Sequence, residues 1–424
     1  MDIDDASPPA KKKTLGITAA DLRGAGRLAT QATIGLTDLV ENLHHNILRV
    51  PMPLGATSLD STRGITGLVY RSIRGVTRLV GGSVDALLGA VVVLTGPGSP
   101  VSSNEREAVV AALNGVLGDH LAATHNPLAT SMSFRRDGQA LTLTREALAL
   151  ALPQARGRVV ILVHGLCMND RQWHRDGHDH GAMLEAIDNI SDISETSDAG
   201  FSVVYLRYNS GLPIATNGAQ FADLIASLMQ AWPVPVQALS IIGHSMGGLV
   251  GRSACAHAAS ADSSWLQQLK HLVCIGSPHH GAPLERGGRW VDVILGASPY
   301  TAAFARLGQL RSAGITDLRH GLPAAMPLPA GVACYAMAAT LSKPSVASIS
   351  ALRGDGLVPV ASALGLRAVA DADRQLAFPA DHQWVGHEMH HLDLLSSTEV
   401  GEQLLVWLNK PSCQVAIDDT GSRQ

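Results

Sequence analysis

The sequence has few cysteines, no long apolar run and no leader-like N-terminus. Its five cysteines are scattered and include no C-x-x-C pair, which excludes a disulfide framework or a zinc site of that type and fits a reducing compartment. The nearest approach to a membrane span, residues 84–94, contains Asp85 and is shorter than the roughly 20 residues required. The lysines at 11–13 are not followed by the apolar segment that a secretory signal requires. We therefore expect no secretory signal and a cytoplasmic location.

Charged and aromatic residues are also scarce, at 16% and 4% of the 424 residues. With a net charge of −4, the chain has no electrostatic basis for binding nucleic acid, and we expect no such partner. The apolar share of 46% is that of a globular protein. At roughly 150 residues per domain, the length predicts two or three domains.

The N-terminal part of the chain predicts helices outside the main domain. Residues 1–17 read as a disordered tail, with an acidic start, Pro-Pro and three lysines. Residues 18–125 predict an amphipathic helical region. Its first helix is expected to begin near Thr18, with Asp21 as the capping partner. A second helical stretch is expected at 62–95, ended by a segment rich in glycine and proline.

A hexad of the pattern G-x-T-x-L-V repeats within this region, at 35–40, 64–69 and 75–80. The last two copies begin 11 residues apart, which is three helical turns and keeps one face apolar. One interpretation is that residues 18–95 associate with a lipid or granule surface. The other is a helical pair packed on the main domain, or a homo-oligomer interface, which amphipathic helices form more often.

The rest of the chain alternates apolar strands with helices, which indicates an α/β fold with a mostly parallel central sheet and helices on both faces. We expect this domain at 130–410, a helical cap or lid at 284–328, and a tail at 411–424. A helix is expected at 104–124 and a hairpin with an Asp-Gly turn at 134–143. The other expected elements are strands at 158–163, 202–206, 238–243, 271–276 and 332–338 and helices at 214–231, 247–260 and 397–409.

One stretch, residues 241–250, has the pattern of a nucleophile elbow. An apolar strand leads into G-H-S-M-G, and a helix-compatible segment follows. In such an elbow Ser245 occupies a strained turn with its hydroxyl presented. Gly243 and Gly247 allow the strand and the helix to approach closely. A serine hydroxyl needs a base, and the base needs an orienting acid, which predicts an acid and a histidine further along the chain.

Asp355 is our candidate acid, because it lies between Gly354 and Gly356 on an expected tight turn. His391 is our candidate base, because it stands in the loop before the final helix, and His390 is its main alternative. The remaining rivals are Asp371, Asp373, Asp381, His382 and His387.

An oxyanion site is expected where the strand at 159–163 ends in His-Gly. Its donors would be the main-chain amides of Leu166 and Met246, which are fixed before charge develops. Four side chains near strand ends are candidates for the rim of the pocket: His164, His244, His279 and Tyr208. For His279, a structural role in the turn after the strand is the favoured alternative.

A histidine-rich segment at 174–180 could suggest a metal, but it lacks the spacing of a closed site and fits a polar loop better. We therefore expect no metal and no cofactor.

Together these blocks resemble an α/β-hydrolase of the lipase/esterase type, over residues 130–410. A further block, G-S-P-H-H-G-A-P at 276–283, is similar to one in triacylglycerol-lipase-like and PGAP1-like serine hydrolases. The resemblance implies Ser245 as nucleophile, Asp355 as acid and His391 as base. Besides the block at 276–283, four blocks carry the resemblance: H-G-L at 164–166, G-H-S-M-G at 243–247, D-G-L-V at 355–358 and H-L-D at 391–393.

Some of these lipases bind calcium near the base, where Asp393 would be one ligand, but no second carboxylate supports it and calcium is not expected. We expect a serine hydrolase that cleaves a small-molecule or lipid carboxylic ester through an acyl-enzyme. The same triad would also serve a thioesterase, an acyltransferase or an intracellular polyester depolymerase. From a different class, the chain could be a lipid- or granule-surface binding protein with a secondary hydrolase domain.

Overall fold

The computed structural model divides into two compact units, Met1–Glu107 with Ala123–Leu128, and Ala108–Ala122 with Ala129–Gln424. The expected tails at 1–17 and 411–424, and most of the expected cap and of the helix at 62–95, lie outside the residues that the structure describes. The described residues are 18–47, 71–75, 77, 78, 82, 85, 104–189, 200–282, 312–322, 326–344, 354–366 and 376–410.

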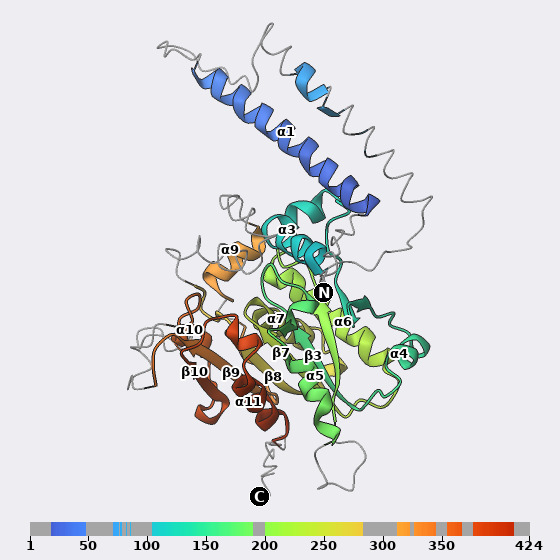
Figure 1. The fold of residues 1–424 in the computed structure, drawn as a ribbon, viewed down its shortest axis with the longest axis vertical. Coiled ribbons are helices and arrows are strands. Elements are labelled where there is room, and N and C mark those ends of the chain that lie inside the picture. Colours follow the sequence, from blue (N-terminus) through green and yellow to red (C-terminus); the bar gives the residue numbers. More distant parts are fainter. Residues whose placement is uncertain are drawn as a thin grey trace, which may run out of the picture. The chain divides into compact units, whose positions relative to one another are not determined.

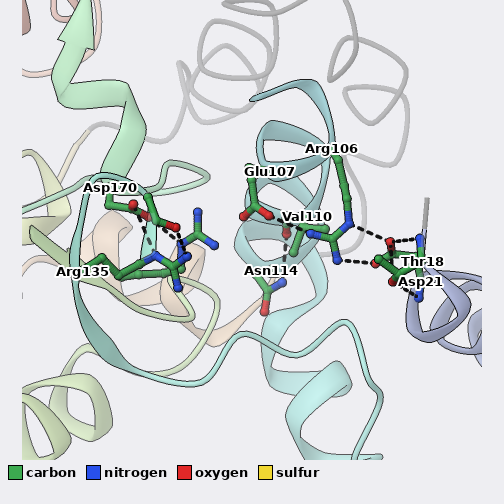
Figure 2. A network of polar contacts seen from close by, with 10 residues as sticks. Thr18, Asp21, Arg106, Glu107, Val110, Asn114, Arg135 and Asp170 are labelled. Carbon is green, nitrogen blue, oxygen red and sulfur yellow. Dashed lines mark hydrogen bonds and ion pairs between the residues drawn. The ribbon is translucent and has the colours of Figure 1, made fainter. Parts of the chain in front are cut away.

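The first unit contains the long helix α1 (Ala19–Ile47). The Thr18 amide donates to Asp21 Oδ2 at 2.8 Å, and the Asp21 amide donates to Thr18 Oγ1 at 3.1 Å. This reciprocal pair is the predicted capping arrangement, and it satisfies two donors that the helix end would leave open. Arg106 binds the same carboxylate through two nitrogens, at 2.5 and 2.6 Å (Figure 2).

A second contact ties α1 to the helical segment that carries Asp85. Arg23 and Arg27 lie one turn apart on α1, and both hydrogen-bond the Asp85 carboxylate. The hydrogen bonds from Arg27 and Arg23 hold the pKa of this carboxyl well below its usual value. In the part of the chain that the structure describes, no helix is both long and apolar enough to cross a bilayer.

The second unit is built on an eight-stranded sheet of order β10-β9-β8-β7-β3-β6-β1-β2 (Figure 1). All neighbours from β10 to β6 are parallel, whereas β1 and β2 are antiparallel additions. The five strands expected from the sequence are confirmed, with each end within about two residues of the expected bound, and β10 is an addition to them. The strands are β1 (Ser133–Arg136), β2 (Gln139–Ala140), β3 (Arg158–Val163), β6 (Ser202–Arg207), β7 (Ala238–His244), β8 (Leu269–Ile275), β9 (Ala333–Thr340) and β10 (Gln383–His387).

The predicted hairpin joins β1 to β2. Asp137 and Gly138 form its turn with φ of 51° and 72°, the two positive values that the tight hairpin turn requires. A separate small sheet pairs β4 (His174–Arg175) with β5 (His178–Asp179).

Both faces of the large sheet are buried, and the alternation along β3 shows this directly. Val159 and Ile161 join a core that includes side chains of α6 (Ile214–Ala231) and α7 (Met246–Ser260). Val160 joins a second core with side chains of α11 (Thr398–Leu408). Helices on both faces are therefore confirmed. The other helices are α3 (Asn104–Ala123), α4 (Arg145–Ala151), α5 (His180–Glu185), α9 (Ala313–His320) and α10 (Val360–Ala363).

Short 3₁₀ turns complete the unit, at Asp170–Trp173, Ala186–Asn189, Ser264–Gln267, Ala380–His382 and Asp393–Leu395.

Helix α3 divides between the units, with Ala108–Ala122 in the second. Its Ala112 and Val116 are buried in the core that contains Leu166 and Cys167. The range 18–125 expected from the sequence assigns all of α3 to the N-terminal helices, whereas most of the helix packs with the sheet.

Candidate active site

Ser245 stands at the turn between β7 and α7. Its backbone has φ 55° and ψ −120°, which for a residue with a side chain costs of order 1–3 kcal/mol. The turn is held because the Ser245 amide donates to the carbonyl of Ile275, at the end of β8, at 2.7 Å. Ser245 is buried, and its Oγ has no hydrogen-bond partner among the described residues.

The two glycines of the G-x-S-x-G pattern are required by close packing. A Cβ on Gly243 would lie 2.3 Å from the amide nitrogen of Gly248. A Cβ on Gly247 would lie 2.2 Å from the carbonyl oxygen of Val163, at the end of β3. Both distances are shorter than any real contact. The sharp turn therefore depends on both glycines, as the sequence pattern indicates.

Asp355 and His391 form a buried pair, with side chains 1% and 2% exposed. His391 Nδ1 lies 2.7 Å from Asp355 Oδ2. The other carboxylate oxygen, Oδ1, accepts the amides of Leu357 and Val358 at 2.9 and 2.7 Å. The His391 amide also donates to the Asp355 carbonyl at 3.2 Å. The carboxylate is thus fixed, with Oδ2 facing the imidazole.

The imidazole of His391 lies beside the elbow. A Cβ on Gly276, which has φ +60° and follows β8, would lie 3.1 Å from His391 Cε1. The ring of His244 is 4.7 Å from the His391 ring, and His244 Nε2 lies 3.2 Å from the His391 carbonyl. His244 precedes Ser245 directly, so the His391 ring lies close to the turn that carries Ser245.

The rival acids and bases lie elsewhere. His382 Nδ1 faces the carbonyl of Cys334 at 3.0 Å, and His387 Nδ1 faces that of Ser342 at 3.3 Å. His390, the neighbour of His391, is exposed. Asp381 is exposed and binds Lys410 at 3.2 Å. Asp371 and Asp373 lie outside the described residues.

The expected oxyanion donors lie at the same edge of the sheet. A Cβ on Gly165 would lie 3.2 Å from Ser245 Cβ, so the loop after β3 runs past the elbow. Leu166 follows in that loop. Met246 is the first residue of α7, where an amide has no partner within the helix and the positive end of the helix dipole adds to it. We name residues 164–170 the oxyanion loop.

The four expected rim residues are all buried, which favours a supporting role over contact with a substrate. Burial lowers the pKa of His164 to about 4. Burial, and then the neighbouring His391, hold the pKa of His244 well below its usual value. Burial and Arg252 do the same for His279, whose Nδ1 lies 3.1 Å from Arg252 Nη1. Tyr208 stacks on His164, with ring centres 4.3 Å apart.

The histidine-rich segment at 174–180 is bonded within the fold. His178 Nε2 lies 2.8 Å from His180 Nδ1, and His180 Nε2 lies 3.0 Å from the Leu394 carbonyl. Asp179 caps α5 through the amides of its first turn. Throughout the described ranges, no group of three His, Cys, Asp or Glu side chains is placed to hold a metal ion.

Sequence patterns assigned no role in the site to Asp170, and they marked Gly276 only as part of the block at 276–283. Gly276 stands against the ring of His391, and its place directly after a strand is the signal that a positive φ is needed. Asp170, at the end of the oxyanion loop, binds Arg207 and carries no local signal. Ser210 accepts the Cys167 amide, and the position of its segment, 207–211, directly after a strand is a sequence signal for a place near the pocket. Asp393 Oδ2 accepts the His390 amide at 2.7 Å, so this carboxylate closes a turn.

Comparison with known proteins gives one family match and several similar solved structures. Residues 154–299 match the model of the PGAP1-like alpha/beta domain family. A thermophilic esterase shares 16% identity over 60% of this chain and 91% of its own, with a TM-score of 0.33. A lipase-esterase related protein from Clostridium acetobutylicum shares 11% over 59% and 94%, with a TM-score of 0.31. The NocB thioesterase domain shares 14% over 60% and 96%, with a TM-score of 0.34.

No curated protein sequence matches the chain. The parallel sheet, the elbow after β7 and the family match together give the second unit the α/β-hydrolase fold that the sequence motifs predict.

Proposed function

We propose that this chain is a serine hydrolase that cleaves carboxylic esters, with Ser245 as nucleophile, His391 as base and Asp355 as the orienting acid. One observation carries the proposal: a buried Asp355–His391 pair, joined at 2.7 Å, lies beside a serine held at positive φ. Structural serines do not need such a backbone, and strained residues of this kind are concentrated at functional sites.

The proposed reaction uses only groups of this chain. His391 Nε2 takes the proton of Ser245 Oγ as the oxygen attacks the ester carbonyl. The amides of Leu166 and Met246 bind the resulting oxyanion. His391 then gives the proton to the departing alcohol, which leaves an acyl group on Ser245. Water enters, gives a proton to His391 and releases the acid, and the proton returns to Ser245.

The tautomer of His391 follows from its partner. Asp355 Oδ2 is an acceptor, so His391 Nδ1 carries the hydrogen and Nε2 keeps its electron pair for the serine. The amides of Leu357 and Val358 donate to Asp355 Oδ1 and fix the orientation of the carboxylate. Asp355 can therefore orient the imidazole and stabilise its charged form without accepting a proton.

A substitution at the nucleophile tests this proposal. We expect Ser245→Ala to fold and to lose hydrolysis of 4-nitrophenyl butyrate by at least about 10³-fold in kcat, because it removes the attacking atom. Ser260→Ala is a matched control, since Ser260 is an exposed serine at the far end of α7, the helix that Ser245 precedes, and it should retain full activity. Activity retained by purified Ser245→Ala would contradict the proposal.

The scissile bond is the least specified part of the proposal. Thioesters and polyesters undergo the same acyl transfer, and the site residues do not discriminate among them. A panel of matched acyl esters, acyl thioesters and polyhydroxyalkanoate, compared by kcat/KM, would separate esterase, thioesterase and depolymerase activity. Transfer to an added alcohol in place of water would indicate an acyltransferase.

A further inference from the structure

We propose that residues 207–210, which end and follow β6, are positioning residues that hold the oxyanion loop so that the Leu166 amide is preset for catalysis. We name this stretch the clamp segment. The inference rests on the proposed function, because it concerns how that site is built. The segment contacts the loop on both sides of Leu166. Ser210 binds Cys167, which is 43 positions away in the sequence, and Tyr208 binds His164, which is 44 positions away.

Before Leu166, the contact joins Tyr208 to His164. The Tyr208 amide donates to His164 Nε2 at 3.3 Å, and the Tyr208 hydroxyl donates to the His164 carbonyl at 2.9 Å. The two rings stack with an interplanar angle of 17°. Because Nε2 accepts, Nδ1 carries the hydrogen and donates to the Gly165 carbonyl at 2.8 Å. The residue two positions before Leu166 is therefore fixed through its ring and its backbone.

After Leu166, the contact joins Ser210 to Cys167. The Cys167 amide donates to Ser210 Oγ at 3.0 Å. Cys167 has φ 57°, so its backbone is strained and must be held by its surroundings. Ser210 is 1% exposed, which means that water does not compete for this bond. Leu166 thus lies between two anchored residues.

The end of the oxyanion loop is fixed by charge. Arg207 Nε lies 2.6 Å from Asp170 Oδ1, and Arg135 Nε lies 3.4 Å from Asp170 Oδ2. Figure 2 shows Arg135 and Asp170 facing each other. The Asp170 side chain is only 3% exposed, and a buried carboxylate is tolerated when it is paired in this way.

The clamp segment is itself anchored, which it must be in order to position anything else. Asn209 Nδ2 donates to the Gly118 carbonyl of α3 at 2.9 Å, and its Oδ1 accepts the Gly211 amide at 3.1 Å. The side chain of Asn217, on α6, donates to the Asn209 carbonyl at 3.0 Å. Tyr208 and Ser210 thus bind the oxyanion loop. Asn209, which lies between them, binds the helices α3 and α6.

The energetic consequence concerns the transition state. Removing one oxyanion donor altogether costs about 10²–10³-fold in kcat. Loosening the loop that carries the donor should lower kcat by part of that factor. The loss should fall on kcat more than on KM, because the oxyanion exists only after attack.

Two near-isosteric variants test the clamp segment. Tyr208→Phe removes only the hydroxyl bond to His164, and Ser210→Ala removes only the acceptor for Cys167. We expect each to lower kcat by about 5- to 50-fold per active site, with KM within about twofold. Affinity for an alkyl boronic acid, whose tetrahedral adduct places an oxygen in the oxyanion site, should fall in parallel.

Tyr205→Phe is the matched control. It removes a tyrosine hydroxyl from β6, the strand that leads into the clamp segment. The Tyr205 hydroxyl binds Asp179 at 3.0 Å, outside the oxyanion loop, so kcat should not change. Titration with a fluorophosphonate gives the active fraction, so misfolded protein does not imitate the effect. Unchanged kcat per active site, or unchanged boronate affinity, in both clamp variants would overturn the inference. A wild-type protein that is neither labelled nor active would instead refute the proposed function.

Discussion

At the scale of single residues, the site depends on a carboxylate with both oxygens occupied. Asp355 Oδ2 meets His391, and Oδ1 meets two backbone amides. Burying this carboxylate without these partners would lower the stability of the fold by several kcal/mol. The turn and the imidazole therefore hold each other in place. Gly354 and Gly356, at φ 55° and 94°, allow the turn that presents this acid.

Replacing the acid tests this arrangement. We expect Asp355→Asn to retain the fold and to lower kcat by roughly 10³–10⁴-fold, because the amide can donate to Nδ1 and thereby stabilise the wrong tautomer of His391. Asp381→Asn is the control, since Asp381 is an exposed rival that binds Lys410, and its activity should equal that of the wild type. Equal effects of the two substitutions on ester hydrolysis would contradict the assignment.

The residue types of the site could be predicted from sequence, because each has a local signal. Ser245 stands in a glycine-flanked elbow, Asp355 lies between two glycines, and His391 precedes the last helix. Their roles stay predictions until the substitutions are measured. Contacts such as Tyr208 with His164 join residues 44 positions apart, and only the folded sheet brings them together.

At the scale of elements, α3 supports the oxyanion loop. Gly115 faces Cys167, and a Cβ there would lie 2.1 Å from the sulfur and 2.9 Å from Cα. The Gly115 carbonyl accepts the hydroxyl of Ser312, the residue that caps α9, at 2.6 Å. One face of α3 therefore contacts the loop after β3 and the start of α9.

A pair of glycine substitutions measures this contact. We expect Gly115→Ala to lower the free energy of unfolding by about 1–3 kcal/mol, because the new methyl group overpacks the core, and to reduce kcat by displacing the oxyanion loop. Gly35→Ala, in α1, meets nothing within 4 Å. It should leave kcat unchanged and stabilise the helix by up to about 1 kcal/mol. Thermal melts and ester kinetics on both variants check this, and a Gly115→Ala protein with wild-type kcat and melting temperature would refute it.

Strands buried on both faces were predictable because they read as continuous apolar runs, as β3 and β7 do. The edge strand β10, with the sequence Q-W-V-G-H, was not, since an edge strand with polar ends has no such run. Helix α3 was assigned to the N-terminal helices because of its position in the sequence. Its packing partners, Cys167 and Asn209, are distant in the chain and gave no sign of the contact.

At the scale of the whole molecule, buried histidines set the response to acid. Burial lowers the pKa of His164, His180 and His271 to about 4 each. In the unfolded chain these groups would titrate near 6.5. Between these values the unfolded chain binds more protons, so the folded state loses stability as the pH falls from about 6.5 to about 4.

These lowered pKa values predict a measurable slope of the free energy of unfolding against pH. Each such histidine contributes about 1.4 kcal/mol per pH unit within that window, so we expect urea midpoints to fall steeply between pH 6.5 and 4.5. His271→Gln should make the slope shallower by about one such contribution. The His271 side chain binds Ser240, away from Ser245, and its loss should not alter ester hydrolysis. A stability that stays flat across this range would show that the buried histidines do not govern it.

The association of residues 18–95 with a lipid or granule surface, and a homo-oligomer formed through them, stay predictions of the repeated hexads. The ion pairs of Arg23 and Arg27 with Asp85 show only that two parts of this region bind each other.

The central claim, that Ser245 is an activated nucleophile, is tested most directly by fluorophosphonate labelling of the intact chain followed by peptide mapping by mass spectrometry. We predict one modified residue, Ser245, with labelling abolished in Ser245→Ala and strongly slowed in His391→Gln but not in His390→Gln. Folded wild-type protein that takes up no label, or that carries it on another residue, would contradict the account.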